Sequence, residues 1–325
     1  MRLFVLCIML GSSAAQANWY FNIDNASYYT DDVALFSTTR RLSLKEDPTQ
    51  PNIDKMGLGS DFIYEPSLEA TWSRHNSFGE MYFSVDVGGY VFTHQSAFTH
   101  GLFDFEFAQS FQTNTKLSLH YNFVPDLFLG KNTFLHETGK EMQYDESLSS
   151  HYWSFHIDQN LTENIVIRLL SRYGLRIYNA PFTYRDTYFW TIGPHLEWAF
   201  NDAIAILVGY HYETGRAEHH RITYFADDLS YTDHYASCEL KVKLSPSLTA
   251  NVIFDYEYNT SMSDRPQDRR FGANENVYQG EVEIEYELTN ATQLKLGWQH
   301  GNHQLNTEIS AVKNNNVWLG FEYKF

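Results

Sequence analysis

Apolar and polar residues alternate one by one along much of this chain. From residue 278 to 288, every even position is apolar or glycine and every odd position is Glu or Gln. The same period of two recurs over residues 293–299 and 317–325. An amphipathic helix repeats its apolar face every three or four residues, and a strand buried on both faces is continuously apolar. The alternation therefore predicts β-strands with one apolar face and one polar face.

Short turns and long loops alternate between the predicted strands. The short turns carry Asn, Asp, Ser or Pro and lie at residues 74–77, 112–115, 162–164, 201–202, 245–247 and 289–291. The long loops lie at residues 30–60, 93–99, 130–149, 179–185, 215–231, 260–275 and 299–314. Six turns and seven loops join fourteen strands, with approximate spans 19–30, 61–73, 79–92, 99–111, 116–129, 149–161, 165–178, 186–199, 203–216, 232–244, 249–261, 276–288, 292–305 and 315–325.

This rhythm is typical of a transmembrane, antiparallel up-and-down β-barrel with short periplasmic turns and long extracellular loops. The strands are long enough to cross a bilayer at a tilt, which takes about nine to eleven residues. Twelve strands remain an alternative if two of the hairpins lie outside the membrane. Residues 18–325 are expected to form this all-β barrel as a single domain, because closure of a barrel needs every strand.

The N-terminus has the layout of a cleaved secretory signal peptide. A positive start at Met1-Arg2 precedes a short apolar run, and Ala15-Gln16-Ala17 is a small-x-small cleavage site. Residues 1–17 are therefore predicted to be removed on export. The alternative is a buried first strand, which the small-residue tract before the cleavage site does not favour.

Composition supports a protein with an apolar outside and a wet inside. Aromatic residues make up 17% of the chain, yet the mean hydropathy is −0.42. After the signal, no run of about eighteen apolar residues could form a transmembrane helix. The net charge of −17 argues against nucleic acid as a partner. The expected partners are the lipid bilayer and lipopolysaccharide, whose bridging divalent cations acidic loops could contact.

The chain ends in an alternating aromatic strand, Phe321-Glu322-Tyr323-Lys324-Phe325. A terminal Phe that closes such a strand resembles the C-terminal assembly signal of Gram-negative outer-membrane β-barrel proteins. The resemblance implies that Phe321, Tyr323 and Phe325 are recognised by the barrel-assembly machinery, which would insert the chain. In strand number and size the chain also resembles the fourteen-stranded monomeric porins, so a monomer in the outer membrane of a Gram-negative bacterium is expected.

If the apolar positions face lipid, the alternate positions face the lumen, and acidic residues outnumber basic ones there. The predicted inward acids are Glu65, Glu69, Glu80, Asp86, Asp104, Glu106, Asp158, Glu197, Glu213, Glu239, Asp255, Glu257, Glu281, Glu283, Glu285, Glu287 and Glu322. The predicted inward bases are Lys116, Arg168, Arg172, Arg176, Lys241, Lys243, Lys295 and Lys324. A lumen lined mainly by one sign of charge concentrates the opposite ion. An open lumen is therefore expected to prefer cations.

Two charged rows on this inner wall invite two interpretations. The basic row consists of Arg168, Arg172 and Arg176, and the acidic row consists of Glu281, Glu283, Glu285 and Glu287. Five strands apart, the rows would produce a transverse field that selects solutes by charge. Alternatively, they neutralise neighbours within hairpins, with Asp158 opposite Arg168 and Glu285 opposite Lys295. Both can hold, since these pairs would leave Arg172, Arg176 and most of the glutamate row free.

Histidines raise the hypotheses of a pH switch or a metal site. His120, His156, His195 and His211 are predicted to face the lumen, and His219-His220 lie in an outer loop. Their spacing matches no zinc motif, so no metal and no cofactor are expected. No nucleophile motif stands out, and sequence neighbours such as Asp233-His234 point to opposite faces of a strand, so no catalytic residues and no enzyme are expected.

The sequence thus favours a porin-like channel for passive or weakly selective diffusion of small hydrophilic solutes. The first loop, residues 31–60, is a candidate to fold inward as a constriction. Several aromatic side chains are predicted to point inward, namely Tyr82, Tyr90, Phe92, Tyr178 and Phe189. If they occlude the lumen, the alternative is a non-conducting barrel that serves as an interaction, export or surface-assembly module. An outer-membrane enzyme is a third hypothesis.

Overall fold

The computed structural model describes residues 18–33, 35–36, 59–135, 140–218, 228–268, 270–307 and 310–325. The predicted signal peptide, most of the first loop and the pair His219-His220 lie outside the described residues. Fourteen strands are described: β1 (Asn18–Thr30), β2 (Asp61–Asn76), β3 (Gly79–Phe92), β4 (His100–Phe111), β5 (Thr115–Leu135), β6 (Glu141–Asn160), β7 (Ile165–Tyr178), β8 (Thr187–Asn201), β9 (Ile204–Ala217), β10 (Tyr231–Ser245), β11 (Leu248–Ser261), β12 (Asn274–Thr289), β13 (Thr292–Leu305) and β14 (Val312–Lys324). Two short 3-10 helices, η1 (Ser96–Phe98) and η2 (Phe182–Arg185), lie in loops.

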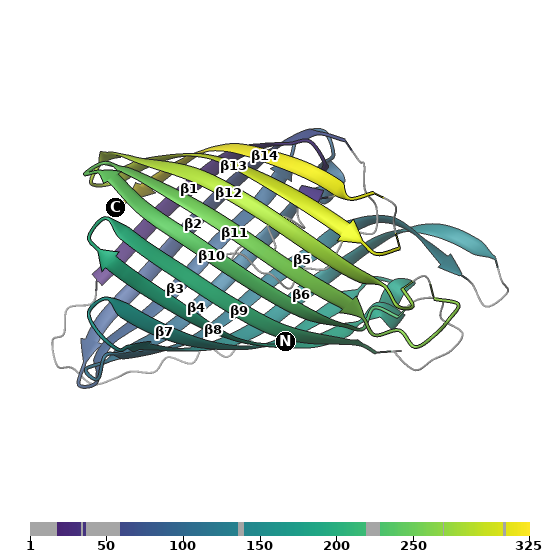
Figure 1. The fold of residues 1–325 in the computed structure, drawn as a ribbon, viewed down its shortest axis with the longest axis horizontal. Helices are drawn as coiled ribbons and strands as arrows, with labels where there is room; N and C mark the ends of the chain where they lie inside the picture. The colour runs from purple at the N-terminus through teal and green to yellow at the C-terminus, as the bar shows by residue number, and fades with distance from the viewer. Residues whose placement is uncertain are drawn as a thin grey trace, which may run out of the picture.

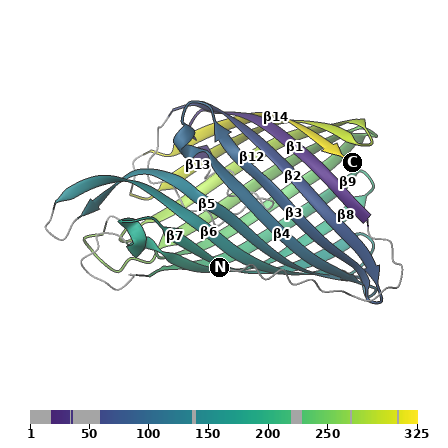
Figure 2. The ribbon, with the colours of Figure 1, turned by 180° about the vertical axis from the view of Figure 1, so that it is seen from behind.

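Each strand pairs antiparallel with its neighbour in sequence, and β1 pairs with β14 to close the barrel. Figures 1 and 2 show the tilted strands wrapping around one axis. The prediction of a fourteen-stranded all-β barrel is confirmed, and the twelve-strand alternative is wrong. No helix in the described part of the chain is long and apolar enough to cross a membrane.

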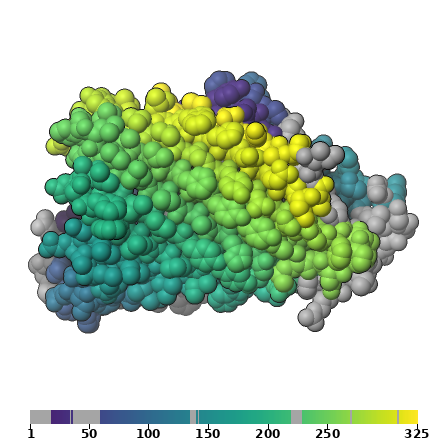
Figure 3. Space-filling view, viewed as in Figure 1, coloured from purple at the N-terminus to yellow at the C-terminus, as the bar shows by residue number. Residues whose placement is uncertain are grey.

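The period of two sorts the side chains onto the two faces of the wall. Large apolar residues of the outer face stay exposed, and the space-filling view shows neighbouring strands forming an unbroken outer wall (Figure 3). One row of outward aromatic rings crosses five strands, with successive ring centroids 4.7–6.3 Å apart. Its members are Phe105, Tyr121, Trp153, Tyr173 and Trp190. Such a belt suits the headgroup depth of a membrane, where aromatic rings gather.

On the inner face, three aromatic rings lie over a glycine of the neighbouring strand, one of them Tyr231 over Gly215. Phe189 covers Gly174 and Trp318 covers Gly297, and each pair is directly opposite in register. A Cβ added at Gly174 or Gly297 would come within about 2 Å of the ring, at 1.9 and 2.0 Å. Both positions therefore require glycine so that a large side chain can fold against the wall rather than across the lumen.

The hairpin β5–β6 departs from the predicted loop at residues 130–149. Its strands have 21 and 20 residues, and the ladder continues from Lys131↔Asp145 to Leu135↔Glu141. The neighbouring strands β4 and β7 pair with this hairpin only as far as Phe123 and Leu148. The remaining part of the hairpin therefore extends beyond the barrel (Figures 1 and 2). The expectation of a loop was wrong there, since backbone pairing between two strands does not require lipid-facing apolar residues.

An apolar cluster fills part of the barrel at the end where the long loops lie. Val33 and Phe36, from the start of the first loop, are buried against β1, β2 and β3. Phe36 packs edge-on against Tyr90 and Phe92 at centroid distances of 5.7 and 6.1 Å. The aromatic residues of this cluster thus gather at one end and join a loop segment, whereas Tyr152 and Trp318 also line the cavities of the charged interior.

Candidate functional site: the charged lumen

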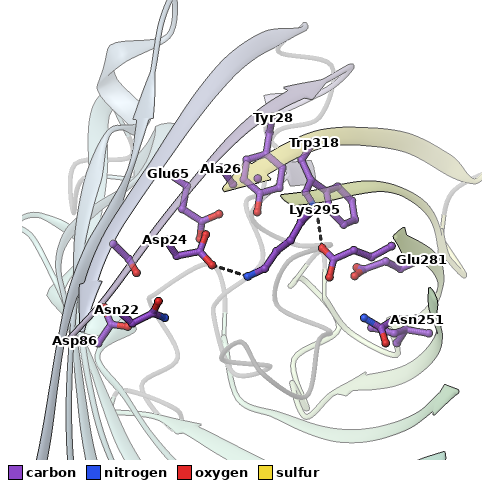
Figure 4. A pocket seen from close by; sticks show the side chains of 14 residues that line it. Asn22, Asp24, Ala26, Tyr28, Glu65, Asp86, Asn251, Glu281, Lys295 and Trp318 are labelled. Carbon is purple, nitrogen blue, oxygen red and sulfur yellow. Dashed lines mark hydrogen bonds and ion pairs between the residues drawn. The ribbon is translucent and has the colours of Figure 1, made fainter. Parts of the chain in front are cut away.

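Two adjoining cavities lie inside the barrel. The first, of 390 Å³, is lined by inward residues of β1–β3 and β11–β14, and Figure 4 shows its side chains converging from both walls. The second, of 460 Å³, is lined by residues of β2–β8. Glu65, Ser67 and Asp86 line both, so the two cavities belong to one charged interior.

The predicted acidic row on β12 faces this interior. Gln299 donates a hydrogen bond to Glu281 at 2.8 Å, and the indole N–H of Trp318 donates to Glu283 at 2.8 Å. Glu285 accepts from Asn251 at 2.8 Å and from Gln293 at 3.1 Å. These donors are neutral and leave the negative charge of the carboxylates in place; in addition, the Nζ of Lys241 lies 3.8 Å from Glu285. Glu287, the last of the row, is exposed near the turn that follows β12.

Lys295 lies opposite Glu285 in register, as predicted, but its ammonium binds elsewhere. Its Nζ lies 2.5 Å from Asp24 (Figure 4). The same Nζ lies 2.8 Å from Glu322. The predicted ion pair between Glu285 and Lys295 was therefore wrong, because closure of the barrel brings Asp24 to the lysine. Asp24 was missed as an inward acid, although the alternation of Phe21 and Ile23 with Asn22 and Asp24 carries the signal.

The basic row on β7 separates into three different environments. Arg168 binds Asp158 through Nε at 2.6 Å and through an N–H of its terminal nitrogen at 2.8 Å, as the hairpin register predicted. Arg172 is buried and lies over the ring of Tyr152 at 4.9 Å, while it still lines the second cavity.

Arg176 does not contribute to an open wall. Its guanidinium donates to the hydroxyl of Tyr231 at 2.9 Å and lies 3.8 Å from Glu213, with both charged side chains 5% exposed. Thr191 and Tyr231 both donate hydrogen bonds to the carboxylate of Glu213. The expectation that Arg176 is free was wrong, because β9 and β10 supply a buried carboxylate and a phenol that hold it.

The carboxylates that share a cavity with Arg168 and Arg172 come from β2–β4 rather than β12. Glu69, Asp86 and Asp104 line the second cavity together with the two arginines. Glu281 and Glu283 line the first cavity. A transverse field in the second cavity therefore runs from the arginines of β7 to the carboxylates of β2–β4. The sequence had predicted a field between β7 and the acidic row of β12.

Four histidines lie on the inner wall near Arg172. His195 and His211 approach each other with 2.6 Å between their Nε2 atoms, and the rings of His120 and His156 lie 4.5 Å apart. Within the described residues, no group of three or more His, Cys, Asp or Glu side chains is arranged to hold a metal ion.

The C-terminal aromatic residues face outward at the seam of the barrel. Phe321, Tyr323 and Phe325 are exposed, and Phe325 stacks on Phe21 of β1 with ring centroids 5.4 Å apart. Backbone hydrogen bonds of 3.0 Å join Phe21 and Phe325 in both directions. The last residue thus belongs to the strand pair that closes the barrel.

The closed wall, the outward aromatic belt and the charged interior define a β-barrel of the kind that spans membranes. The structure is similar to the outer membrane channel DcaP of Acinetobacter baumannii, with a TM-score of 0.56 and 10% identity over 96% of this chain and 97% of that one. It is also similar to OmpT, an outer membrane protein of Vibrio cholerae, in a loop L8 deletion mutant, with a TM-score of 0.51 and 10% identity over 96% and 100% of the two chains. These likenesses concern the fold alone, and they agree with the barrel fold that the alternation and the loop rhythm predicted. No protein-family model and no curated protein matches the sequence.

Proposed function

We propose that this protein is a porin-like channel of the Gram-negative outer membrane, through which small hydrophilic solutes diffuse with a preference for cations. The observation that carries the proposal is the charged interior, in which carboxylates line both cavities. Along β12 these carboxylates are held mainly by neutral donors and keep their charge toward the lumen. The fold shared with an outer membrane channel supports the proposal.

The mechanism is diffusion under an electrostatic bias. Inward carboxylates raise the local concentration of cations in a narrow aqueous lumen with low-dielectric walls and lower that of anions. Arg168 and Arg172 on the other side of the second cavity add a transverse component that orients dipolar solutes. Solutes would be separated by charge and dipole rather than by a tight, specific fit.

The proposal also covers how the protein is exported and inserted, and which molecules surround it. A cleaved signal peptide of residues 1–17 would direct the chain across the inner membrane, and the barrel-assembly machinery would recognise the C-terminal strand. The barrel would then function as a monomer among lipid and lipopolysaccharide, with its long loops outside the cell.

The test is single-channel conductance in a planar bilayer across a salt gradient. We expect steady conductance and a reversal potential that shows cation preference. Replacing the acidic row, by Glu281→Gln, Glu283→Gln and Glu285→Gln together, should reduce the cation-to-anion permeability ratio about twofold or more at low salt, where screening is weak. The measurement should therefore use about 0.1 M salt or less, at which the Debye length is about 10 Å.

The matched control removes three negative charges outside the lumen, by Glu163→Gln, Asp202→Asn and Asp264→Asn, all at exposed positions in turns or loops. This variant should keep the permeability ratio of the unchanged protein. A folded barrel without conductance would contradict the channel, whereas conductance with anion preference would contradict the selectivity alone.

A second candidate function is a barrel that binds a partner at its outer end. The apolar cluster that includes Val33 and Phe36 narrows this end, and the β5–β6 hairpin extends beyond it. A folded, non-conducting barrel would favour this alternative.

A further inference from the structure

A transverse row of oxygen-bearing side chains crosses five strands of the inner wall. The register pairs Asn22 with Glu69, Glu69 with Asp86, Asp86 with Asp104, and Asp104 with Asn122. All five line the cavities, and Asp86 lines both. The row therefore presents an amide, three adjacent carboxylates and a second amide along β1–β5.

The row holds more hydrogen-bond acceptors than donors. The carboxylate of Asp86 has no hydrogen bond and no ion pair with any described residue. Within the described residues, the carboxylate of Glu69 accepts one hydrogen bond, from the hydroxyl of Thr71 at 2.9 Å. Asn122 is 5% exposed, lines the second cavity, and has an Oδ1 without a hydrogen-bond partner in the described structure. The Oδ1 of Asn22, at the other end, is also buried without a described partner.

This arrangement is unfavourable without a cation. Like charges directly opposite each other on neighbouring strands destabilise the sheet, and a buried acceptor without a donor is also destabilising. The nearest described bases approach only one end, where the Nδ1 of His120 lies 3.9 Å from Asp104. A positively charged ligand would relieve both the repulsion and the missing donors.

The spacing of the row indicates an extended ligand. Neighbouring strands lie about 4.8 Å apart, so the carboxylates succeed one another at intervals of about 5 Å and do not surround a point. No described group of three or more such side chains is arranged for a metal ion. Ammonium groups joined by three or four methylenes also lie about 5–6 Å apart when the chain is extended.

We infer that the row Asn22–Glu69–Asp86–Asp104–Asn122 binds linear oligoamines, with successive ammonium groups on successive carboxylates. The inference rests on the proposed aqueous lumen and specifies the solute class that this lumen retains. Arg168 and Arg172 line the same cavity as the row and repel the ligand from their wall. The bound amine therefore lies along β1–β5.

The experiment is isothermal titration of the purified, folded protein in detergent with spermidine, propylamine and Mg²⁺. Spermidine is expected to bind about tenfold or more tightly than propylamine, because each further ammonium–carboxylate contact contributes a factor of about five in a wet site. Mg²⁺ is expected to bind more weakly than spermidine. Asp86→Asn, which removes the central charge at constant shape, should weaken spermidine binding about fivefold.

The matched control is Glu197→Gln, which removes the same charge from an exposed inward position of β8, outside the row. It should change spermidine binding less than twofold, an effect of about 0.4 kcal/mol. Equal weakening by both variants would show that only net charge matters and would overturn the inference, as would tighter binding of Mg²⁺ or no preference for spermidine over propylamine.

Conductance separates this inference from the proposed function. If the protein conducts with cation preference but does not prefer spermidine over propylamine, only the inference that the row binds oligoamines is contradicted. A barrel that binds spermidine in the predicted order, but does not conduct, contradicts the channel and leaves the binding row supported.

Discussion

Arg168 and Arg176 lie on the same face of β7, eight residues apart in sequence, and differ in burial. The side chain of Arg168 is 42% exposed and pairs with Asp158 across a hairpin. Arg176 and its carboxylate partner Glu213 are each 5% exposed. An exposed ion pair contributes little because water solvates and screens both charges, whereas removing one member of a buried pair leaves an uncompensated charge.

We therefore predict that Arg176→Met lowers the free energy of unfolding by about 3–5 kcal/mol. Arg168→Met should lower it by about 0–1 kcal/mol, and serves as the control on the same strand. Urea unfolding from lipid vesicles, followed by tryptophan fluorescence, measures both values. A cost for Arg176→Met no larger than that for Arg168→Met would contradict the structural role of the buried pair.

At the scale of elements, neighbouring strands of the inner wall fit together through glycine. Trp318 of β14 lies over Gly297 of β13, and from there its indole N–H reaches Glu283 of β12. One glycine thus determines where a large ring rests and how a lumen carboxylate is oriented. The β5–β6 hairpin shows a different use of pairing, since it continues beyond the barrel by its own ladder.

Gly297→Ala is expected to displace the indole of Trp318, because the new Cβ would lie 2.0 Å from the ring. The free energy of unfolding should fall by about 1–3 kcal/mol, as in other overpacked interiors. Gly280→Ala is the control, since a Cβ there meets no atom within 4 Å. Equal effects of the two substitutions in urea unfolding would contradict the predicted clash.

At the scale of the whole molecule, the seam between β1 and β14 decides whether the wall is closed. The pairing runs from Asn22↔Lys324 to Thr30↔Asn316, and Phe325 stacks on Phe21 at its end. The C-terminal strand therefore has two tasks: it closes the finished barrel, and by its resemblance to an assembly signal it would be recognised during insertion.

Phe325→Ser is predicted to lower the amount of folded protein in the outer membrane several-fold, since the terminal aromatic residue would be lost to the assembly machinery. Phe200→Ser, at an exposed aromatic residue near the end of β8, removes a comparable ring and should have little effect. Quantitative immunoblotting of outer-membrane fractions compares the two variants. Similar levels for both would mean that the end of the chain is not read as a signal.

The sequence by itself determined the strands, their faces and their number. Side chains alternate in every strand, so a local run such as residues 278–288 already shows which positions meet lipid and which meet the lumen. Residues of the short turns then indicate where those hairpins reverse, and the hairpin register follows, as for Asp158 and Arg168. These properties depend on residues close together in the chain, and therefore could be predicted.

The tertiary structure alone decided which charged groups meet. Lys295 of β13 binds Asp24 of β1, 271 positions away in the sequence. Closure of the barrel makes this possible, because it places β1 beside β14, which is the neighbour of β13. The acceptor row from Asn22 to Asn122 likewise exists only once the registers of four strand pairs are aligned. The alternation along a strand determines which face of the wall a side chain lies on. The stagger and closure of the barrel determine which side chains lie next to it. These neighbours then determine whether a charged group forms an ion pair or stays accessible to a solute.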